Sequence, residues 1–213
     1  MTLQIHTIVS QPFDENTYVV WLEGRTDALV IDPGLEPDLI LDFLARFGLT
    51  PAAILNTHGH ADHIGGNEAV KQAVPQAPLL IGEHEAVMLA DPWLNLSAVL
   101  GTPITSPPAD RTLSEGEAIE YAGIPLEVRL APGHSPGHIV FVHRGGPCRV
   151  FGGDVLFRGG TGRYDFPGGS YATLMSSIRE QLFTLPDDTV VYPGHGPVTT
   201  TGHERRTNPY LGD

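Results

Sequence analysis

Four potential metal ligands stand close together directly after an apolar strand, and this cluster constrains the fold more than any other feature. The cluster follows the run Ala53–Leu55 and comprises His58, His60, Asp62 and His63. Histidine nitrogens and aspartate oxygens together suit zinc, iron or manganese. In an extended segment the first two histidines point to the same side, so both can reach one metal. Functional groups of α/β proteins concentrate where strands end, so the cluster predicts a metal site there.

Short β-branched runs closed by Pro, Gly or Asp predict strands. They are Leu3–Val9, Thr17–Leu22, Ala28–Ile31, Ala53–Asn56, Leu79–Ile81, Ile124–Leu130, Ile139–His143, Arg149–Phe151 and Thr189–Tyr192. Apolar residues at three- and four-residue spacing predict helices. They are Pro37–Phe47, Ile64–Ala73, Glu83–Ala90 and Ala172–Leu185. Runs of strands punctuated by helices predict an α/β fold with a mixed sheet or two packed sheets and helices outside. No polar linker divides the chain, so we expect one domain over residues 1–213, with Pro103–Arg111 as a loop.

The composition is that of a globular protein and excludes several partners. The chain has 25 acidic residues against 12 Lys and Arg and a net charge of −13, which disfavours nucleic acid as a partner. No run reaches the roughly 18 apolar residues that cross a bilayer, so no membrane partner is expected. Met1–Ser10 lacks the basic residues of a secretory signal, and a single cysteine, Cys148, allows no disulfide within the chain. We therefore expect a cytoplasmic protein.

Three further candidate ligands stand in turns rich in glycine and proline. His134 and His195 each follow Pro-Gly, and Asp154 follows Gly-Gly. Turns of this kind at strand ends can project a side chain into a shared cleft.

Taken together, these motifs resemble the metallo-β-lactamase-fold hydrolases. Residues 57–63, 131–138, 152–154 and 192–196 look like the metal motifs of that family and occur in its order. Residues 162–169 and 204–210 resemble a short bacterial branch of the glyoxalase II-like hydrolases, which act on hydroxyacylglutathione thioesters. The resemblance implies an αββα four-layer sandwich of two mixed sheets with helices outside.

The resemblance also implies two divalent metal ions, with zinc favoured and iron or manganese as alternatives. One metal is assigned to His58, His60 and His134, and the second to Asp62, His63 and His195. Asp154 would bridge the two and Asp62 would orient the nucleophile, so these two aspartates are the predicted catalytic residues. Coordination lowers the pKa of water toward about 7, so metal-bound hydroxide would attack the thioester carbonyl without a Ser or Cys nucleophile.

Substrate recognition is open at this stage. Glutathione thioesters carry carboxylates, which cations near the cleft would help to bind. The candidates are Arg158, Arg163, Arg205 and Arg206, with Tyr164 packing on the ligand. In the alternative interpretation, the last two arginines are solvated on a terminal helix and Arg163 braces the site. Only 18 residues follow His195, so we expect no helical C-terminal domain of the kind that full-length glyoxalase II enzymes use to bind glutathione, and Tyr164 stands where close relatives carry threonine. The oligomeric state is likewise open.

Competing interpretations use the same residues differently. A persulfide dioxygenase-like oxygenase needs one iron on His58, His134 and Asp154, since two histidines and a carboxylate suit non-haem iron. A lactonase or esterase of the same superfamily is a further alternative. The acidic charge disfavours a nuclease, and Asp154 in place of a soft cysteine disfavours a β-lactamase. Among the remaining polar residues, His138 is predicted to orient a ligand or to fill the core. Asp32 is predicted to cap a turn or to hydrogen-bond a metal ligand. His6, His84, His143 and His203 are expected to make local hydrogen bonds.

Overall fold

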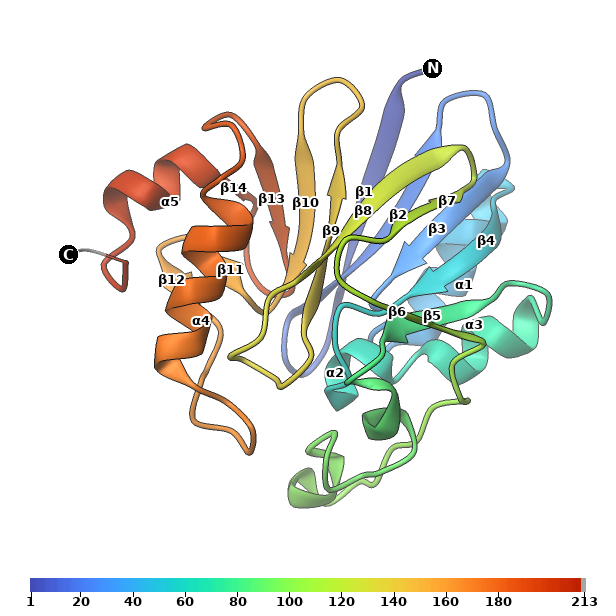
Figure 1. Cartoon of the computed structure of the whole chain (residues 1–213). Coiled ribbons are helices and arrows are strands. Elements are labelled where there is room, and N and C mark those ends of the chain that lie inside the picture. The colour runs from blue at the N-terminus through green and yellow to red at the C-terminus, as the bar shows by residue number, and fades with distance from the viewer. Residues whose placement is uncertain (212–213) are drawn as a thin grey trace.

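Two mixed β-sheets face each other in the computed structural model, which describes residues 1–211 (Figure 1). The first sheet is ordered β1 (Leu3–Ser10), β2 (Glu15–Leu22), β3 (Asp27–Ile31), β4 (Thr50–Leu55), β5 (Leu79–Gly82) and β6 (Arg111–Leu113). The second is ordered β14 (Thr199–Thr200), β13 (Val190–Pro193), β10 (Arg149–Gly153), β9 (Ile139–His143), β8 (Ile124–Leu130) and β7 (Ala118–Tyr121). A separate hairpin pairs β11 (Leu156–Phe157) with β12 (Gly160–Thr161). Strands β3 to β6 run parallel, as do β10 and β13, while the other pairs are antiparallel.

Helices cover the outer faces of both sheets (Figure 1). The helical elements are α1 (Pro37–Phe47), α2 (Ala61–Ile64), α3 (Asn67–Ala73), the 3-10 turns η1 (Ala86–Leu89) and η2 (Ser97–Leu100), α4 (Tyr171–Ser177), the π turn η3 (Ile178–Leu182) and α5 (Thr201–Thr207). Helices α1 and α3 lie on the first sheet, and α4 lies on the second. Within the described residues, no helix is both long enough and apolar enough to cross a membrane.

The core has three layers because the sheets are apolar on both faces. In β3, Leu29 points into the space between the sheets, whereas Val30 points outward to α1. Phe141 and Phe151 from the second sheet fill the same inter-sheet layer. On the outer side of that sheet, Leu174 of α4 packs over the strands. The predicted four-layer αββα architecture is therefore confirmed.

Every predicted strand is present, with ends shifted by up to three residues, and α1 has the predicted bounds. The sequence did not indicate β6, β7, β11, β12 or β14. These strands have two to four residues and carry few β-branched apolar side chains. Their pairing depends on the neighbouring strands, which local sequence does not reveal.

The predicted helix Ile64–Ala73 is wrong as a single element. It is divided into α2 and α3 by Gly65 and Gly66. The amide of Gly66 donates to the carbonyl of Pro33, 2.8 Å away, outside any helical ladder. This contact holds the chain after β3 against the end of α2, so the break serves the site described below.

Two other helix predictions need correction. Within Glu83–Ala90 only the 3-10 turn η1 forms, because the amide of Glu83 continues a strand-like bond to Leu113 and the side chain of Glu85 turns inward. The helix predicted over Ala172–Leu185 ends at Leu182 and its last turn is a π turn. Pro186, which has no amide hydrogen, closes the segment that follows.

Candidate metal centre

The ligand-bearing loops all leave the carboxyl ends of strands. In the first sheet, Ile31 pairs with Leu55, and the neighbouring strand pairs Leu55 with Leu80, so β3, β4 and β5 end together. In the second sheet, β8, β10 and β13 end at a common edge. Two bonds join the edges of the sheets: the amide of Ile139 donates to the Thr57 carbonyl at 2.9 Å, and that of Asn16 donates to the Gly194 carbonyl at 2.7 Å. The facing sheets therefore bring the separate loops into one cleft.

The first cluster, here called the imidazole trio, consists of His58, His60 and His134. The Nδ1 atom of His60 lies 3.1 Å from Nε2 of His58 and 2.9 Å from Nε2 of His134. Nitrogen ligands of a tetrahedral zinc with bonds of about 2.05 Å lie about 3.3 Å apart. All three side chains are buried, so the trio is a compact nitrogen site that is close to the spacing that zinc requires.

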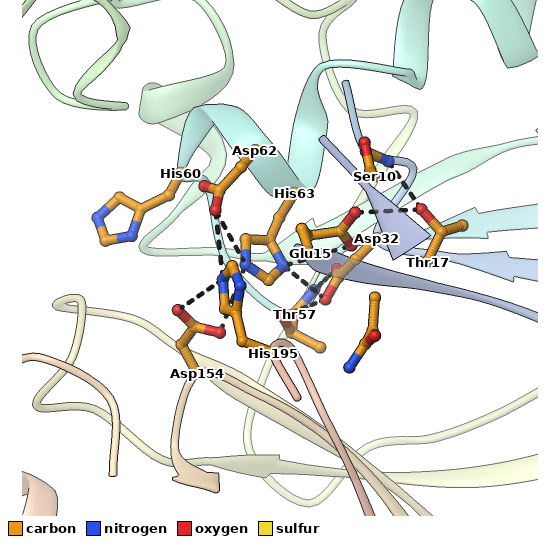
Figure 2. Close-up of polar contacts among 12 residues, drawn as sticks. Ser10, Glu15, Thr17, Asp32, Thr57, His60, Asp62, His63, Asp154 and His195 are labelled. Atoms are coloured by element: carbon orange, nitrogen blue, oxygen red, sulfur yellow. Dashed lines mark hydrogen bonds and ion pairs between the residues drawn. The ribbon is translucent and has the colours of Figure 1, made fainter. Parts of the chain in front are cut away.

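The second cluster, the mixed trio, consists of Asp62, His63 and His195 (Figure 2). Oδ2 of Asp62 lies 3.3 Å from Nε2 of His195 and 3.8 Å from Nε2 of His63. The side chains of Asp62 and His195 are 20% and 23% exposed, so this trio borders solvent while the imidazole trio does not. The mixed trio is therefore the more solvent-accessible of the two.

Asp154 lies between the trios, and Figure 2 shows it beside His195 of the mixed trio. Its Oδ1 is 3.4 Å from Nε2 of His63, and its Oδ2 is 3.5 Å from Nε2 of both His134 and His195. One carboxylate thus faces ligands of both trios. The seven predicted ligands therefore form one continuous group around Asp154.

The outward nitrogen of three ligand rings has a carbonyl or carboxylate partner. Nδ1 of His134 donates to the Arg163 carbonyl at 2.8 Å, and Nδ1 of His195 donates to the Phe13 carbonyl at 2.9 Å. Nδ1 of His63 donates to a carboxylate oxygen of Asp32 at 3.1 Å. When a metal binds, these bonds leave the Nε2 lone pair of these three rings for the centre, as in metal-binding histidines, whereas His60 directs its Nδ1 inward.

Two atoms inside the centre lack any hydrogen-bond partner. They are Nε2 of His63 and Oδ1 of Asp154, both fully buried and facing each other. Buried polar atoms are rarely left unsatisfied, and an atom of this kind calls for a ligand. A divalent metal ion would satisfy both, so the donor set fits the metals that the sequence implied.

The trios differ in charge state when they hold no metal. Burial and the neighbouring histidines lower the pKa of His58 well below its usual value, and burial together with His134 lowers that of His60 to about 3. For His63, burial opposes the charge, but Asp62 and Asp154 outweigh it and raise the pKa well above its usual value. The carboxylates likewise raise the pKa of His195 against the effect of burial.

Asp32 and His138 brace the ligands from outside. Oδ1 and Oδ2 of Asp32 accept from the amide and hydroxyl of Thr57, both at 2.7 Å, and Oδ2 also accepts from His63. Nε2 of His138 accepts from the amide of Asp154 at 3.0 Å, and its ring stacks on that of His58 at 4.7 Å. Their positions agree with the orienting role that the sequence suggested.

The loop 162–170 covers the imidazole trio. Its Phe166 ring lies edge-on to His60, with centroids 5.5 Å apart. The guanidinium of Arg163 stacks over Phe166 at 4.2 Å and forms a two-bond pair with Asp165. Tyr164 packs against Tyr171 and is 39% exposed. The structure therefore brings Arg163 to the rim of the centre and leaves Tyr164 partly open to solvent.

Arg205 and Arg206 lie elsewhere. Both pair with Asp187, and Arg205 also donates to the carbonyl of Phe183 and stacks over its ring. They stand on α5, next to the turn that precedes β13. This placement favours the alternative interpretation of surface residues on a terminal helix, and their assignment as substrate ligands remains only a prediction.

Sequence reasoning missed several residues that touch or support the centre, among them Glu15, whose Oε1 lies 4.0 Å from Nδ1 of His63, Glu85 and Phe157. Glu85 is completely buried and its carboxylate accepts from the amides of Gly59 and Gly137. The Phe157 ring packs against that of His195, with ring centroids 5.9 Å apart. The next residue, Arg158, lies at the exposed tip of the β11–β12 hairpin. A glutamate inside a predicted amphipathic helix gives no sign of burial. The one sequence signal for a close contact with Glu85 was a glycine in each of the two ligand motifs, Gly59 and Gly137.

Comparison with known proteins agrees with the geometry. The profile of the family described as "Metallo-beta-lactamase superfamily" matches residues 11–195. The chain is 40% identical to the "Probable metallo-hydrolase YqgX" of Bacillus subtilis, covering 94% of this chain and 93% of that protein. It is 37% identical to the "Hydroxyacylglutathione hydrolase GloC" of Haemophilus influenzae, covering 98% of each.

Solved structures are similar over the whole chain. BLEG-1, titled a B3 metallo-beta-lactamase, superposes with a TM-score of 0.94 at 37% identity, covering 99% of this chain and 100% of that one. TTHA1623, in a di-iron-bound form, has a TM-score of 0.84 at 38% identity, covering 97% and 100%. ETHE1 from Myxococcus xanthus has a TM-score of 0.77 at 30% identity, covering 97% and 83%.

Proposed function

Because the chain belongs to the metallo-beta-lactamase superfamily and is a metal-dependent hydrolase, we propose that it hydrolyses thioesters, with hydroxyacylglutathione as the substrate class. The relative named hydroxyacylglutathione hydrolase, which covers nearly the whole chain, supports this substrate. The site would hold two divalent metals. The di-iron neighbour supports a pair of ions and keeps iron beside zinc as a candidate.

The observation that carries the proposal is the position of Asp154 between two separate trios. An oxygenase with one iron would need only His58, His134 and Asp154. It would have no use for the mixed trio, whose three side chains are nonetheless gathered within ligand distance of one another. A complete second set of ligands therefore favours hydrolysis at a pair of metals.

When bound, a pair of divalent ions would lower the pKa of a water molecule and polarise the carbonyl of the substrate. The chain supplies the rest. Asp62, at the solvent-exposed side of the mixed trio, is placed to accept a hydrogen bond from the entering water and so to orient it. Phe166 and Met88, which packs against Gly59, shield the imidazole trio from bulk water.

Recognition of an anionic thioester would rest on few cations. Arg163 stands above Phe166 at the rim of the imidazole trio, where it pairs with Asp165 at the surface. Arg158 is exposed and follows Phe157, whose ring packs on His195. A substrate carboxylate would exchange with Asp165 for Arg163 or pair with Arg158, and glutathione has two carboxylates.

The test is thiol release from a hydroxyacylglutathione by zinc-loaded protein, measured beside oxygen uptake with glutathione persulfide by iron-loaded protein. We expect thiol release that disappears after chelation and returns with metal. Arg163→Ala should raise KM for the anionic thioester about twofold to fivefold and leave an uncharged thioester unaffected, since an exposed ion pair contributes modestly. Oxygen uptake with the persulfide, without thiol release from the thioester, would contradict the hydrolase proposal and favour the oxygenase.

Two alternatives keep a place in the assay. The ETHE1 neighbour is compatible with the oxygenase. Because one neighbour is titled a B3 metallo-beta-lactamase, a β-lactam must be assayed as a third substrate, although Asp154 in place of a cysteine disfavours this activity. A β-lactam that is turned over faster than any thioester would overturn the proposed substrate class and leave the metal centre intact.

A further inference from the structure

Glu85 connects the two loops that carry the imidazole trio. Its Oε2 accepts from the amide of Gly59 at 2.9 Å, and its Oε1 accepts from the amide of Gly137 at 2.6 Å. Gly59 stands between His58 and His60, and Gly137 stands three residues after His134. One buried carboxylate thus spans the gap between loops that come from different sheets.

The chain is built to bring this carboxylate close. A Cβ atom on Gly59 would lie 2.5 Å from Cβ of Met88, and one on Gly137 would lie 2.4 Å from Cβ of His84. Only glycine at both positions lets residues 84–88 approach the loops closely enough for Glu85 to reach both amides. The two glycines and the buried glutamate therefore form one arrangement.

The mixed trio has a different support. His63 is held by Asp32, and His195 by the carbonyl of Phe13. Neither bond involves Glu85, whose carboxylate accepts from the amides of Gly59 and Gly137. Asp32, after β3, also accepts from the amide and hydroxyl of Thr57 next to His58, so it borders both trios, whereas Glu85, after β5, contacts only the two loops of the imidazole trio.

We propose that Glu85 is the positioning residue for the metal held by the imidazole trio and has no part in holding the other metal. The inference rests on the two-metal site of the proposed function. By fixing the amides of Gly59 and Gly137 at two oxygens of one carboxylate, Glu85 sets the distance between the His58–His60 pair and His134. Groups that orient metal ligands typically change metal affinity by about 10- to 100-fold when lost.

The test is the stepwise zinc affinity of the full chain, measured by chelator competition in the wild type and in Glu85→Gln. An amide has only one acceptor oxygen, and its NH2 group would face the second backbone amide. We expect one zinc affinity to fall about 10- to 100-fold and the other to change less than about twofold. The matched control is Glu83→Gln, the same change two residues away on a side chain that is 48% exposed, and it should alter neither affinity.

Two backgrounds assign the affected site. Glu85→Gln added to His195→Ala, in which the imidazole trio is intact, should weaken zinc binding. Added to His134→Ala, in which the mixed trio is intact, it should leave zinc binding unchanged. An equal loss at both sites would overturn the inference, because it would mean general damage. Unchanged affinities would overturn it as well.

The metal content and thioesterase activity of the wild type distinguish failure of the proposed function from failure of the inference about Glu85. A wild type that holds two zinc ions but shows no thioesterase activity removes the substrate and leaves the role of Glu85 to be decided by affinity. A wild type that holds no zinc overturns both. If Glu85→Gln does not fold, Glu85→Asp retains both oxygens but is one methylene shorter, and it should show the same selective loss.

Amide exchange in the metal-free wild type provides a check without mutation. The amides of Gly59 and Gly137 should be protected from exchange, and rapid exchange at both would overturn the inference.

Discussion

The two trios of the metal centre have similar sizes and opposite electrostatics. The imidazole trio is buried, and the pKa values of His58 and His60 are lowered by burial, so these rings are neutral without metal. The mixed trio borders solvent, and the carboxylates around His63 and His195 raise their pKa values. Before any metal binds, one half of the centre is therefore ready to accept a cation. The other half holds protons in its place.

The largest expected effect comes from the residue that belongs to both halves. Asp154→Asn removes the carboxylate charge that faces His63, His134 and His195. Thiol release should fall by at least about 100-fold, with weaker zinc binding at the mixed trio. Asp27→Asn, at a carboxylate paired with Arg25 at the far end of β3 from the centre, is the matched control. Turnover near the wild-type level with two metals bound would show that Asp154 is not the bridge.

Removing a ligand from one half sharpens the comparison. His195→Ala should leave one zinc ion per chain, on the imidazole trio, and reduce thioester hydrolysis about 100-fold, because the second metal needed for the reaction is lost. Metal analysis and thiol release measured on the same preparation check this prediction. A single metal in the wild type, with activity that survives His195→Ala, would favour the oxygenase.

The zinc affinities of the two trios should respond differently to pH, which compares the trios without mutation. The raised pKa values of His63 and His195 mean that zinc must displace protons from the mixed trio, so its zinc affinity should fall as the pH falls from 8 to 6. The loss is at most about tenfold per pH unit for each proton displaced. His60, with its pKa near 3, stays neutral over this range, so chelator competition should find a smaller change at the imidazole trio.

The same shifts have the opposite consequence for the metal-free protein. Groups with raised pKa values stabilise the folded state below their unfolded pKa, near 6.5 for histidine, and this stability is lost as the pH rises through the folded value. Thermal unfolding of the chelated protein should therefore occur at lower temperature at pH 9 than at pH 8, a range in which His58, His60 and His138, whose pKa values are lowered, are neutral in both the folded and the unfolded state. A metal-free melting temperature that rises over this range would contradict the charge states assigned to the mixed trio.

The smallest effect is expected far from both halves. Arg205→Ala combined with Arg206→Ala removes the pairs with Asp187. Exposed pairs contribute at most about 1 kcal/mol each, so the melting temperature should fall by only a few degrees. KM for an anionic thioester should be unchanged. A rise in KM for that substrate alone would restore the arginines as substrate ligands.

The sequence predicted those parts of the molecule that local patterns determine. The strand before His58 and the spacing of the four ligands after it are contiguous, so the position of the cluster at a strand end was predictable. The grouping with Asp154 and His195 depended on resemblance to a family, since no local pattern joins residues so far apart. The seven side chains lie together in the structure, and their roles as metal ligands remain predictions.

Other features depend on contacts that the sequence does not display. The break between α2 and α3 arises where Gly66 bonds to Pro33 across the fold. Glu85 turns inward because two amides from distant loops meet there, and the short strand β14 forms because β13 is beside it. In each case the local sequence is compatible with more than one secondary structure, and long-range contacts determine which one forms.

Each trio takes ligands from both sheets, and this fixes the order in which the centre can be assembled. His58, His60, Asp62 and His63 are synthesised early, whereas His134, Asp154 and His195 follow only with the second half of the chain. A nascent chain that has made the first sheet has an incomplete donor set for either position. Neither position can therefore reach its full donor set until the second sheet has docked on the first.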